Sequence, residues 1–303
     1  MRNAFIDELT LLAEEDDKIF LIIGDLGFGV IENFEKRFPN QFLNAGVAEQ
    51  NMMGMAAGLA SAGYKVYVYS IGNFPVFRCL EQIRNDICYE ELDVSIVSIG
   101  AGLSYGTLGY SHHAIDDIGV MSALPGMTIY SPADPIETRR ALRESVSLQT
   151  PKYFRLGKSG EPSLFNEIPT EFPNWTGLAN GNDLLVLTTG AITIEAIEAA
   201  ALLQDMGIEI SVFAIPLLKP LAFDKNLIGR FENVIVLEEH SKSGGLGTIL
   251  SEQLALSGIK VNLVKLGLPD QVHHELGSQK HLRHHFELDA LGIVSKVKEM
   301  LGN

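Results

Sequence analysis

The stretch FLNAGVAEQNMMGMAAGLASAG, residues 42–63, places one carboxylate, Glu49, among small and apolar residues and contains no Lys or Arg. Its pattern predicts the end of a strand, a glycine-containing turn and a helix that opens at the acid. An acid in the first turn of a helix is favoured by the helix dipole. An acid in apolar surroundings can also exchange a proton near neutral pH. The residues alone leave both interpretations open.

The same strand-to-helix pattern repeats along the chain. Short apolar runs typical of buried strands alternate with amphipathic runs typical of helices. The expected strands lie at residues 18–25, 64–70, 93–100, 126–132, 183–190, 208–215, 233–239 and 260–267. The expected helices include residues 49–63, 77–92, 135–147 and 191–207. This alternation predicts an α/β fold with doubly wound, mostly parallel sheets that helices cover on both faces.

The pattern stops in a polar segment that contains Pro162, Pro169 and Pro173. We interpret residues 159–182 as a linker. The sequence therefore predicts two domains, at residues 1–158 and 183–303.

The composition argues against several classes of function. Lys and Arg number 23 and Asp and Glu number 38 among 303 residues, so the formal net charge is 23 − 38 = −15. Such an acidic chain is not expected to bind nucleic acid or an anionic membrane. Two cysteines, Cys79 and Cys88, are too few for a disulfide framework. The N-terminal stretch is not typical of a signal peptide, and no run suits a membrane span, so a cytoplasmic location is expected.

In open α/β sheets, ligands bind beyond the carboxyl ends of the strands. That rule selects four loops, at residues 24–29, 45–49, 70–77 and 100–113. The third loop carries Phe74 and Phe77, and such aromatics either fill a core or form a platform for a flat ring. The fourth loop is rich in glycine and is expected to be mobile. It ends at His112 and His113, a pair that is either structural or placed for proton transfer or carbonyl binding.

Three further features have a structural interpretation. Asp134, with Pro135 next to it and Glu137 three residues on, is typical of a helix N-cap. SGGLGT, residues 243–248, fits no phosphate-loop pattern, and we expect a loop that opens a helix. HHELGSQKHLRHH, residues 273–285, has no cysteine and a histidine spacing that suits an exposed helix or turn, so we expect no metal site there.

Several segments together carry a family resemblance. They are GDLGFG (24–29), FLNAGVAEQNMMGMAAGLASAG (42–63), EQIRNDI (81–87), AGLSYGTLGYSHHAIDDI (101–118), SPADPIET (131–138), YFRLGK (153–158) and VLEEHSKSGGLGT (236–248). Over nearly its whole length the chain resembles the pyrimidine-binding and C-terminal domains of transketolases and of deoxyxylulose-phosphate synthase. GVAEQN, residues 46–51, is the most specific part of this resemblance.

The resemblance implies that the chain uses thiamine diphosphate. Glu49 matches the family's glutamate that hydrogen-bonds nitrogen N1′ of the aminopyrimidine ring and so promotes loss of the proton from the reactive carbon. Such an acid must be shielded from water, and we expect it to have no Lys or Arg partner. Glu49 and His112 are therefore the expected catalytic residues.

The resemblance also implies the contacts of the cofactor and the substrate. Cofactor contacts are expected at Asp25, Leu26, Glu49, Ile71, Phe74, Phe77 and Arg78. Phe74 would stack on the pyrimidine, and Arg78 matches an arginine of the synthase branch. Substrate contacts are expected at Arg2, His112, His113 and Arg155, with the two arginines binding an anionic group.

Three positions depart from the family pattern. Leu108 stands where transketolases have an aspartate that hydrogen-bonds sugar hydroxyls. Gly29 and Gly100 stand where a serine and a histidine are usual. A deoxy, less hydroxylated or nucleotide-linked sugar would suit such a site better than an ordinary pentulose phosphate.

The family's Gly-Asp-Gly motif, which binds Mg²⁺ and the diphosphate, is absent from the sequence. The resemblance then implies that an N-terminal partner subunit supplies those ligands, and that this chain pairs with itself within a heterotetramer. We expect a C-terminal subunit of a two-chain enzyme that transfers a two-carbon ketol unit between sugars. Two alternatives remain: the beta subunit of a 2-oxo acid dehydrogenase, and a non-catalytic subunit that assembles a partner.

Overall fold

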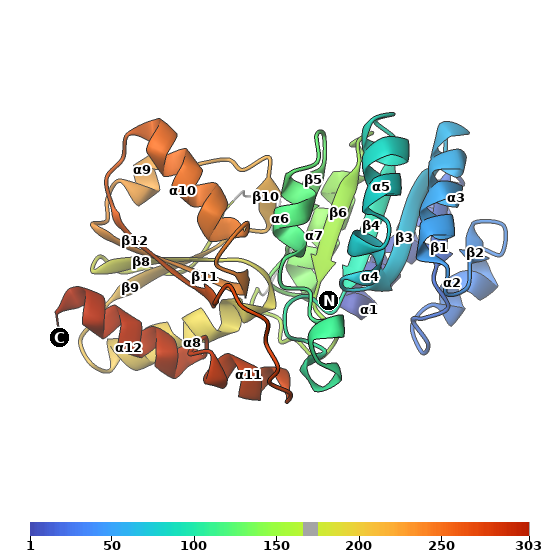
Figure 1. Cartoon of the computed structure of the whole chain (residues 1–303). Coiled ribbons are helices and arrows are strands. Elements are labelled where there is room, and N and C mark those ends of the chain that lie inside the picture. Colours follow the sequence, from blue (N-terminus) through green and yellow to red (C-terminus); the bar gives the residue numbers. More distant parts are fainter. Residues whose placement is uncertain (166–174, 303) are drawn as a thin grey trace.

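The computed structural model describes residues 1–165 and 175–302, which form two α/β units, each built around one sheet (Figure 1). The first sheet has the strand order β10-β5-β6-β4-β3-β1-β2, and the second has the order β12-β11-β8-β9-β7. Neighbouring strands run parallel, except that β10 pairs antiparallel with β5 and β7 pairs antiparallel with β9. Both exceptions lie at a sheet edge, so the expected α/β class with mostly parallel sheets is confirmed.

The strands of the first sheet are β1 (Ile19–Ile23), β2 (Phe42–Asn44), β3 (Lys65–Ile71), β4 (Val94–Ile99), β5 (Thr128–Tyr130), β6 (Lys152–Leu156) and β10 (Leu217–Lys219). Those of the second are β7 (Thr176–Ala179), β8 (Leu184–Thr188), β9 (Ile210–Ala214), β11 (Asn233–Ser241) and β12 (Asn262–Leu268). The central strands β4 and β8 are buried along their whole length, as parallel strands covered on both faces must be.

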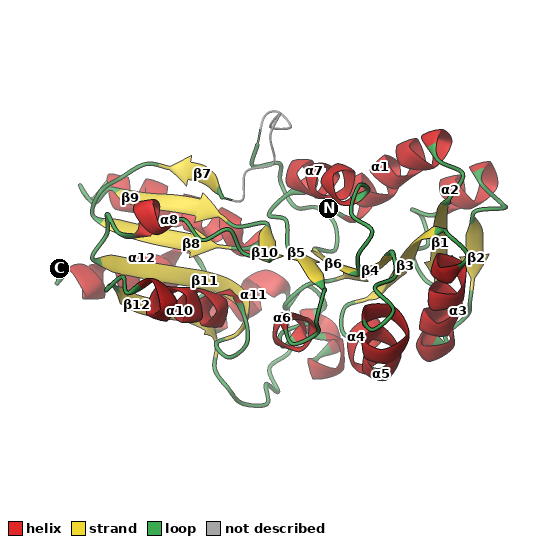
Figure 2. Cartoon of the chain, turned by 90° about the horizontal axis from the view of Figure 1, so that it is seen from above, coloured by secondary structure: helices red, strands yellow, loops and turns green. Residues whose placement is uncertain are grey.

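The helices of the first unit are α1 (Arg2–Glu15), α2 (Glu32–Arg37), α3 (Glu49–Ser61), α4 (Phe74–Phe77), α5 (Leu80–Gln82), η1 (Ile83–Cys88), η2 (Gly106–Leu108), η3 (Tyr110–His112), α6 (Asp117–Ser122) and α7 (Pro135–Ser145). Those of the second are η4 (Gly190–Ile192), α8 (Thr193–Gln204), α9 (Lys225–Ile228), α10 (Leu246–Ser257), α11 (Gln279–His285) and α12 (Ala290–Leu301). Helices α1 and α7 cover one face of the first sheet, and α3, α5 and α6 cover the other (Figure 2). No helix in the described part of the chain is long and apolar enough to cross a bilayer.

Two expected helix starts are confirmed. The Asp134 carboxylate accepts a hydrogen bond of 2.7 Å from the backbone N–H of Glu137, which makes it the N-cap of α7. Gly245 is the N-cap of α10, so SGGLGT is a loop that opens a helix. Both features fix the start of a helix.

One hydrophobic core runs through both units. Ile118 and Met121 of α6 belong to the same buried cluster as Leu185 of β8 and Leu250 of α10. The two units therefore pack along an apolar seam, because burying these side chains removes apolar surface from water. This seam sets the position of the second unit beside the loop at the carboxyl end of β4.

The segment expected to be a linker, residues 159–182, is only partly irregular. Residues 166–174 lie outside the described residues, but Thr176–Ala179 form strand β7 at the edge of the second sheet. The expected helix at 77–92 is also interrupted: its first residue ends α4, and α5 and the π-helix η1 follow after turns at residues 78–79. The sequence pattern predicted the helical region correctly and did not predict its breaks.

A buried acid ties α7 to the beginning of β7. The Glu137 carboxyl group accepts hydrogen bonds from the backbone N–H of Ala133 (2.7 Å) and from the Thr176 hydroxyl (3.1 Å). Burial raises the pKa of Glu137 to about 7, and the nearby Asp134 acts in the same direction. Because the folded protein favours the protonated form, this contribution to stability is present below the ordinary pKa of about 4.5 and is lost as the pH rises through 7.

We therefore expect Glu137→Gln to flatten the pH dependence of unfolding. Between pH 5 and pH 8 the wild-type protein should lose about 2.5 kcal/mol more of its unfolding free energy than the variant does. Urea denaturation at the two pH values measures the difference. Glu144→Gln, on the exposed face of the same helix, is the control. Equal losses in the wild type and in Glu137→Gln would contradict the prediction.

Candidate active site

The four loops selected from the sequence lie along one edge of the first sheet, because they follow the neighbouring parallel strands β1, β2, β3 and β4. Two asparagine side chains tie them together in pairs. Asn44 exchanges hydrogen bonds of 3.0 and 3.1 Å with Asp25, which joins the loops after β2 and β1. Asn73 donates to the Ser111 carbonyl at 2.8 Å and joins the loops after β3 and β4. Sequence reasoning missed both asparagines, although each stands at or just after a strand end.

Glu49 is the first residue of α3 and is only 5% exposed. Its carboxylate lines a cavity of about 440 Å³ together with Val47, Ala48, Gln50, Asn51 and Arg78. The acid therefore lies at a helix N-terminus, which favours its charge, and at the wall of a cavity that could hold a ligand.

The expectation that Glu49 has no basic partner is wrong. Arg78 donates from Nη1 to both carboxylate oxygens of Glu49, each at 3.1 Å, while the arginine side chain remains 51% exposed. The arginine was missed because it stands far from Glu49 in sequence and reaches it only when the loop after β3 turns back over α3. The acid is thus shielded from water by an arginine as well as by its apolar neighbours.

Phe74 lies beside this ion pair. The Arg78 guanidinium carbon is 4.3 Å from the centre of the Phe74 ring, within the range of a cation–π contact. The ring of His112 meets Phe74 edge to face, with ring centres 5.1 Å apart. The structure therefore brings Glu49, Arg78, Phe74 and His112 into one continuous row of contacts that runs from α3 to the loop after β4.

The other expected cofactor residues lie outside this row, at or after the ends of β1 and β3. Ile71, at the end of β3, is partly buried, and Leu26 packs partly buried against the core on the α1 side of the sheet. Phe77 is 42% exposed and lines a second cavity of about 250 Å³ with Tyr110 and His113. Asp25 is exposed and is held by Asn44.

The two neighbouring histidines have different environments. His112 is partly buried, and its Nδ1 lies 3.0 Å from the Ser111 hydroxyl. His113 is 2% exposed, and neither of its ring nitrogens has a hydrogen-bond partner within residues 1–165 and 175–302. Burial lowers the pKa of His113, so its ring is neutral near pH 7. His112 is therefore the better placed of the two to exchange protons with a ligand at the row of contacts.

The two arginines expected to bind an anion have different environments. Arg155 is 2% exposed and bonded to protein groups through two of its three nitrogens: Nε donates to Asp117 at 2.9 Å, and Nη2 donates to the carbonyls of Ala114 (2.7 Å) and Glu239 (2.9 Å). The Arg155 guanidinium joins the two units through these contacts, and the expected substrate contact at Arg155 stays a prediction. Arg2 is partly exposed at the start of α1.

Tyr105 and Lys158 are further candidates that sequence reasoning did not single out. The Tyr105 ring lies 6.4 Å from that of His112, and the Lys158 ammonium lies 5.0 Å from the centre of the tyrosine ring. Burial raises the pKa of Tyr105, and the charge of Arg2 is near enough to oppose that shift. A β-carbon added to Gly100 would lie 2.1 Å from the Tyr105 ring, so the tyrosine fills the space of the missing side chain.

The row of contacts suits the pyrimidine half of thiamine diphosphate. A planar cation already lies on the Phe74 face and donates to the Glu49 carboxylate, so a flat ring with a protonated nitrogen matches both surfaces. Among residues 1–165 and 175–302, no group of three His, Cys, Asp or Glu side chains could hold a metal ion.

Comparison with known proteins agrees with the fold. Residues 1–161 match the pyrimidine-binding domain of transketolase, and residues 175–293 match the transketolase C-terminal domain. The chain is 33% identical to one of the subunits of the apulose-4-phosphate transketolase of Phocaeicola vulgatus, over 99% of this chain and 97% of that protein. It is 31% identical to a 6-deoxy-6-sulfo-D-fructose transketolase subunit of a Clostridium species, over 99% and 94% of the two chains.

A solved structure described as a split-gene transketolase, in an inactive beta4 tetramer, superposes with a TM-score of 0.87. The two chains are 34% identical, and the match covers 99% of this chain and 97% of the other. The resemblance inferred from sequence motifs is confirmed by both kinds of comparison. The chain belongs to the transketolase family, of which it contains the pyrimidine-binding and C-terminal portions.

Proposed function

We propose that this chain is the C-terminal subunit of a two-chain, thiamine-diphosphate-dependent enzyme that transfers a two-carbon ketol unit between sugar substrates. The observation that carries the proposal is the row from Glu49 through Arg78 and Phe74 to His112. It combines a buried acid, an aromatic face and an imidazole along one edge of the sheet. When bound, thiamine diphosphate supplies the carbon nucleophile for this chemistry.

In this proposal each residue of the chain has a defined task. Glu49 holds a proton at a ring nitrogen of the pyrimidine, and Phe74 supports the ring from one face. His112 exchanges protons with the oxygens of the sugar, assisted through its contact with Ser111. Arg78, which is half exposed, moves aside from the Glu49 carboxylate when the pyrimidine takes that position.

The proposed partner is an N-terminal subunit that carries the Mg²⁺ and diphosphate ligands. The sequence has no Gly-Asp-Gly motif, and the related split-gene protein was solved as an inactive tetramer of beta chains. We propose that two copies of this chain assemble with two partner subunits, so that each cofactor lies between the two kinds of chain.

His113, which lacks a partner within the described residues, lines the neighbouring cavity and would contact the substrate only after local movement.

The proposed substrates end in an anionic group and carry few hydroxyls near His112. Arg2 and Lys158 flank Tyr105 at the far end of the row, and two cations favour a phosphate or sulfonate. The Phocaeicola and Clostridium relatives are transketolase subunits for apulose 4-phosphate and for 6-deoxy-6-sulfo-D-fructose, each of which has such a group. Leu108 is 53% exposed and offers no hydrogen bond to a hydroxyl.

A change at Leu108 tests this substrate assignment. We expect Leu108→Asp to raise kcat/KM for a fully hydroxylated ketose phosphate by about tenfold, because a well-placed hydrogen bond is worth about 1.4 kcal/mol. Activity toward a donor that lacks the corresponding hydroxyl should not rise, because that donor offers the new carboxylate no hydrogen bond. Steady-state kinetics with the two donors measures the ratio of their kcat/KM values, and Leu108→Asn controls for the charge. An unchanged ratio in Leu108→Asp would contradict the assignment.

The experiment that tests the proposed function is calorimetric titration of thiamine diphosphate with Mg²⁺ into this chain alone and into the chain with its partner. We expect the chain alone to bind at least about a hundredfold more weakly, since the diphosphate contacts are missing. The reconstituted pair should then transfer a ketol unit between a ketose and an aldehyde. Decarboxylation of pyruvate without ketol transfer would instead support the 2-oxo acid dehydrogenase alternative, and absence of cofactor binding by the pair would support a non-catalytic subunit.

A further inference from the structure

The loop that carries His112, residues 100–113, rests on the second unit through its glycines. At Gly102 the backbone has φ +62°, and an added β-carbon would lie 2.6 Å from Cγ of Glu239 and 2.8 Å from its backbone oxygen. The backbone N–H of the next residue, Leu103, donates to the Glu239 carboxylate at 3.2 Å. The side chain of Leu103 is fully buried in the core of the second unit. Glycine at position 102 is therefore required by close approach to the second unit.

Two further glycines of the loop, Gly106 and Gly109, also approach the second unit closely. A β-carbon on Gly106 would lie 2.4 Å from Cδ1 of Leu282 and 2.6 Å from the Gly277 oxygen, and the Gly277 N–H donates to the Gly106 carbonyl at 3.3 Å. A β-carbon on Gly109 would lie 2.9 Å from the Leu276 side chain. The expected mobility of this glycine-rich loop is thus contradicted by its geometry. Its glycines let the backbone pack against α11 and the segment before it.

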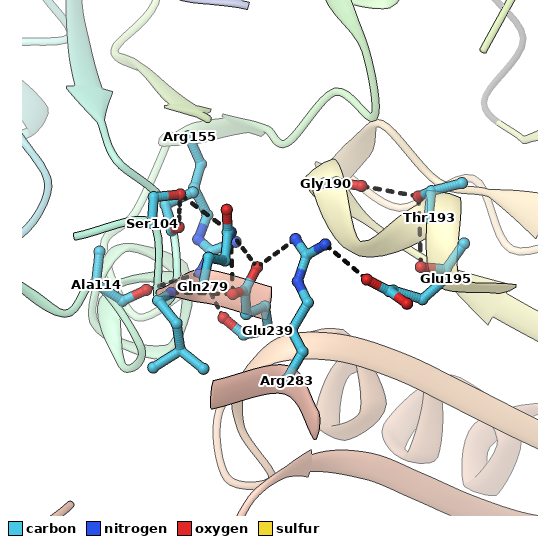
Figure 3. Close-up of polar contacts among 12 residues, drawn as sticks. Ser104, Ala114, Arg155, Gly190, Thr193, Glu195, Glu239, Gln279 and Arg283 are labelled. Atoms are coloured by element: carbon cyan, nitrogen blue, oxygen red, sulfur yellow. Dashed lines mark hydrogen bonds and ion pairs between the residues drawn. The ribbon is translucent and has the colours of Figure 1, made fainter. Parts of the chain in front are cut away.

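Glu239 is itself held by residues of the second unit (Figure 3). Gln279 donates to both of its carboxylate oxygens, at 3.0 and 2.9 Å, and also to the Ser104 hydroxyl of the loop at 3.2 Å. Arg283 donates to Glu239 at 2.9 Å and to Glu195 of α8 at 3.1 Å. Buried charges that are paired and hydrogen-bonded in this way fix one arrangement of the groups around them.

The residues that follow the loop are fastened to the same strand. Arg155 bridges the carbonyls of Ala114 and Glu239, and the backbone N–H of Ser241 donates to the Ile115 carbonyl at 2.6 Å. Strand β11 therefore holds the loop from Leu103 to Ile115, on both sides of His112.

We propose that the second unit positions the substrate-handling imidazole: Glu239 and α11 fix the loop, and the loop fixes His112. Glu239 is a positioning residue in this account, since it touches neither substrate nor cofactor. The proposal rests on the proposed function, because it assigns the C-terminal portion a part in ketol transfer. Its physical basis is that a catalytic group displaced by about 1 Å can cost up to about a hundredfold in rate.

The sharpest variant is Gly106→Ala. The backbone at Gly106 is not left-handed, so alanine can adopt its conformation. The new methyl group therefore acts only by pushing the loop away from the second unit. Gly58→Ala is the matched control, because Gly58 is a helical glycine with no atom within 4 Å of an added β-carbon. Gln279→Ala is a milder variant that removes the amide bridging Ser104 and Glu239 without leaving a charge unpaired.

In the reconstituted enzyme, Gly106→Ala should lower kcat/KM for the ketose donor by about 10- to 100-fold, and Gln279→Ala by about threefold. Thiamine diphosphate affinity should stay within about twofold of the wild type, because Glu49 and Phe74 are on other loops. A purely structural role would instead lower cofactor binding and turnover together, in proportion to the loss of folded protein, and would overturn the proposal.

Amide hydrogen exchange on the isolated chain separates this proposal from the proposed function. We expect the amides of residues 101–112 to exchange at least about tenfold faster in Gly106→Ala than in the wild type or in Gly58→Ala. Unchanged protection of the loop in Gly106→Ala would overturn the proposal even if the enzyme transfers ketol units. Faster exchange would support the positioning of the loop by the second unit even if the wild-type pair proves to catalyse a different reaction.

Discussion

Glu49→Gln is expected to lower kcat of the reconstituted enzyme by about three orders of magnitude. The amide keeps the size of the side chain and can still accept one hydrogen bond, but it cannot share a proton with a ring nitrogen, and general acid–base catalysis of this kind contributes about 10²- to 10⁴-fold. Initial rates of ketol transfer at saturating donor and cofactor measure the loss.

The control for Glu49→Gln is the same chemical change at an exposed acid. Glu35 lies on α2 with its side chain exposed, and Glu35→Gln should leave kcat within about twofold. Circular dichroism should show both variants folded, because Gln at position 49 still accepts a hydrogen bond from Arg78. A kcat of Glu49→Gln close to that of the wild type would mean that the buried acid has no catalytic task.

The second large effect is expected at the other end of the row. His112→Ala should lower kcat/KM for the donor by about 10²- to 10⁴-fold, because it removes the imidazole that exchanges protons with the sugar oxygens. Cofactor affinity should change little, since the His112 contact with Phe74 is an edge contact between ring centres 5.1 Å apart. Steady-state kinetics together with calorimetric titration of thiamine diphosphate measure the two quantities.

His284→Ala serves as the histidine control. Its side chain is 70% exposed on α11 and pairs with Asp289, so its loss should not alter kcat/KM. If His112→Ala also lost cofactor affinity in proportion to activity, His112 would support the ring and would not handle protons on the substrate.

The regular elements could be predicted because each carries its own periodicity. Strands such as β1 and β4 are rich in apolar residues, and the start of α7 is indicated by Asp134 and Pro135. The short edge strands β7 and β10 were missed, because they are only three or four residues long and pair with strands that are not their neighbours in sequence. Such pairing depends on the packing of one segment against another and leaves no local pattern.

The position of the candidate site could be predicted from the sequence, but most of its side-chain contacts could not. The rule that ligands bind beyond the carboxyl ends of parallel strands placed the four loops on one edge. It could not show that Arg78 pairs with Glu49, that Arg155 is occupied by Asp117, or that Tyr105 fills the space beside Gly100. Each of these contacts depends on how the loops fold over one another, and only the folded chain brings the side chains together.

The measurement that tests the central claim most directly is a crystal structure of this chain with its N-terminal partner, Mg²⁺ and thiamine diphosphate. The account predicts nitrogen N1′ of the pyrimidine within hydrogen-bond distance of the Glu49 carboxylate, the ring on Phe74 and the Arg78 guanidinium displaced from its present place. A pyrimidine bound elsewhere, with the Glu49–Arg78 ion pair intact, would contradict it.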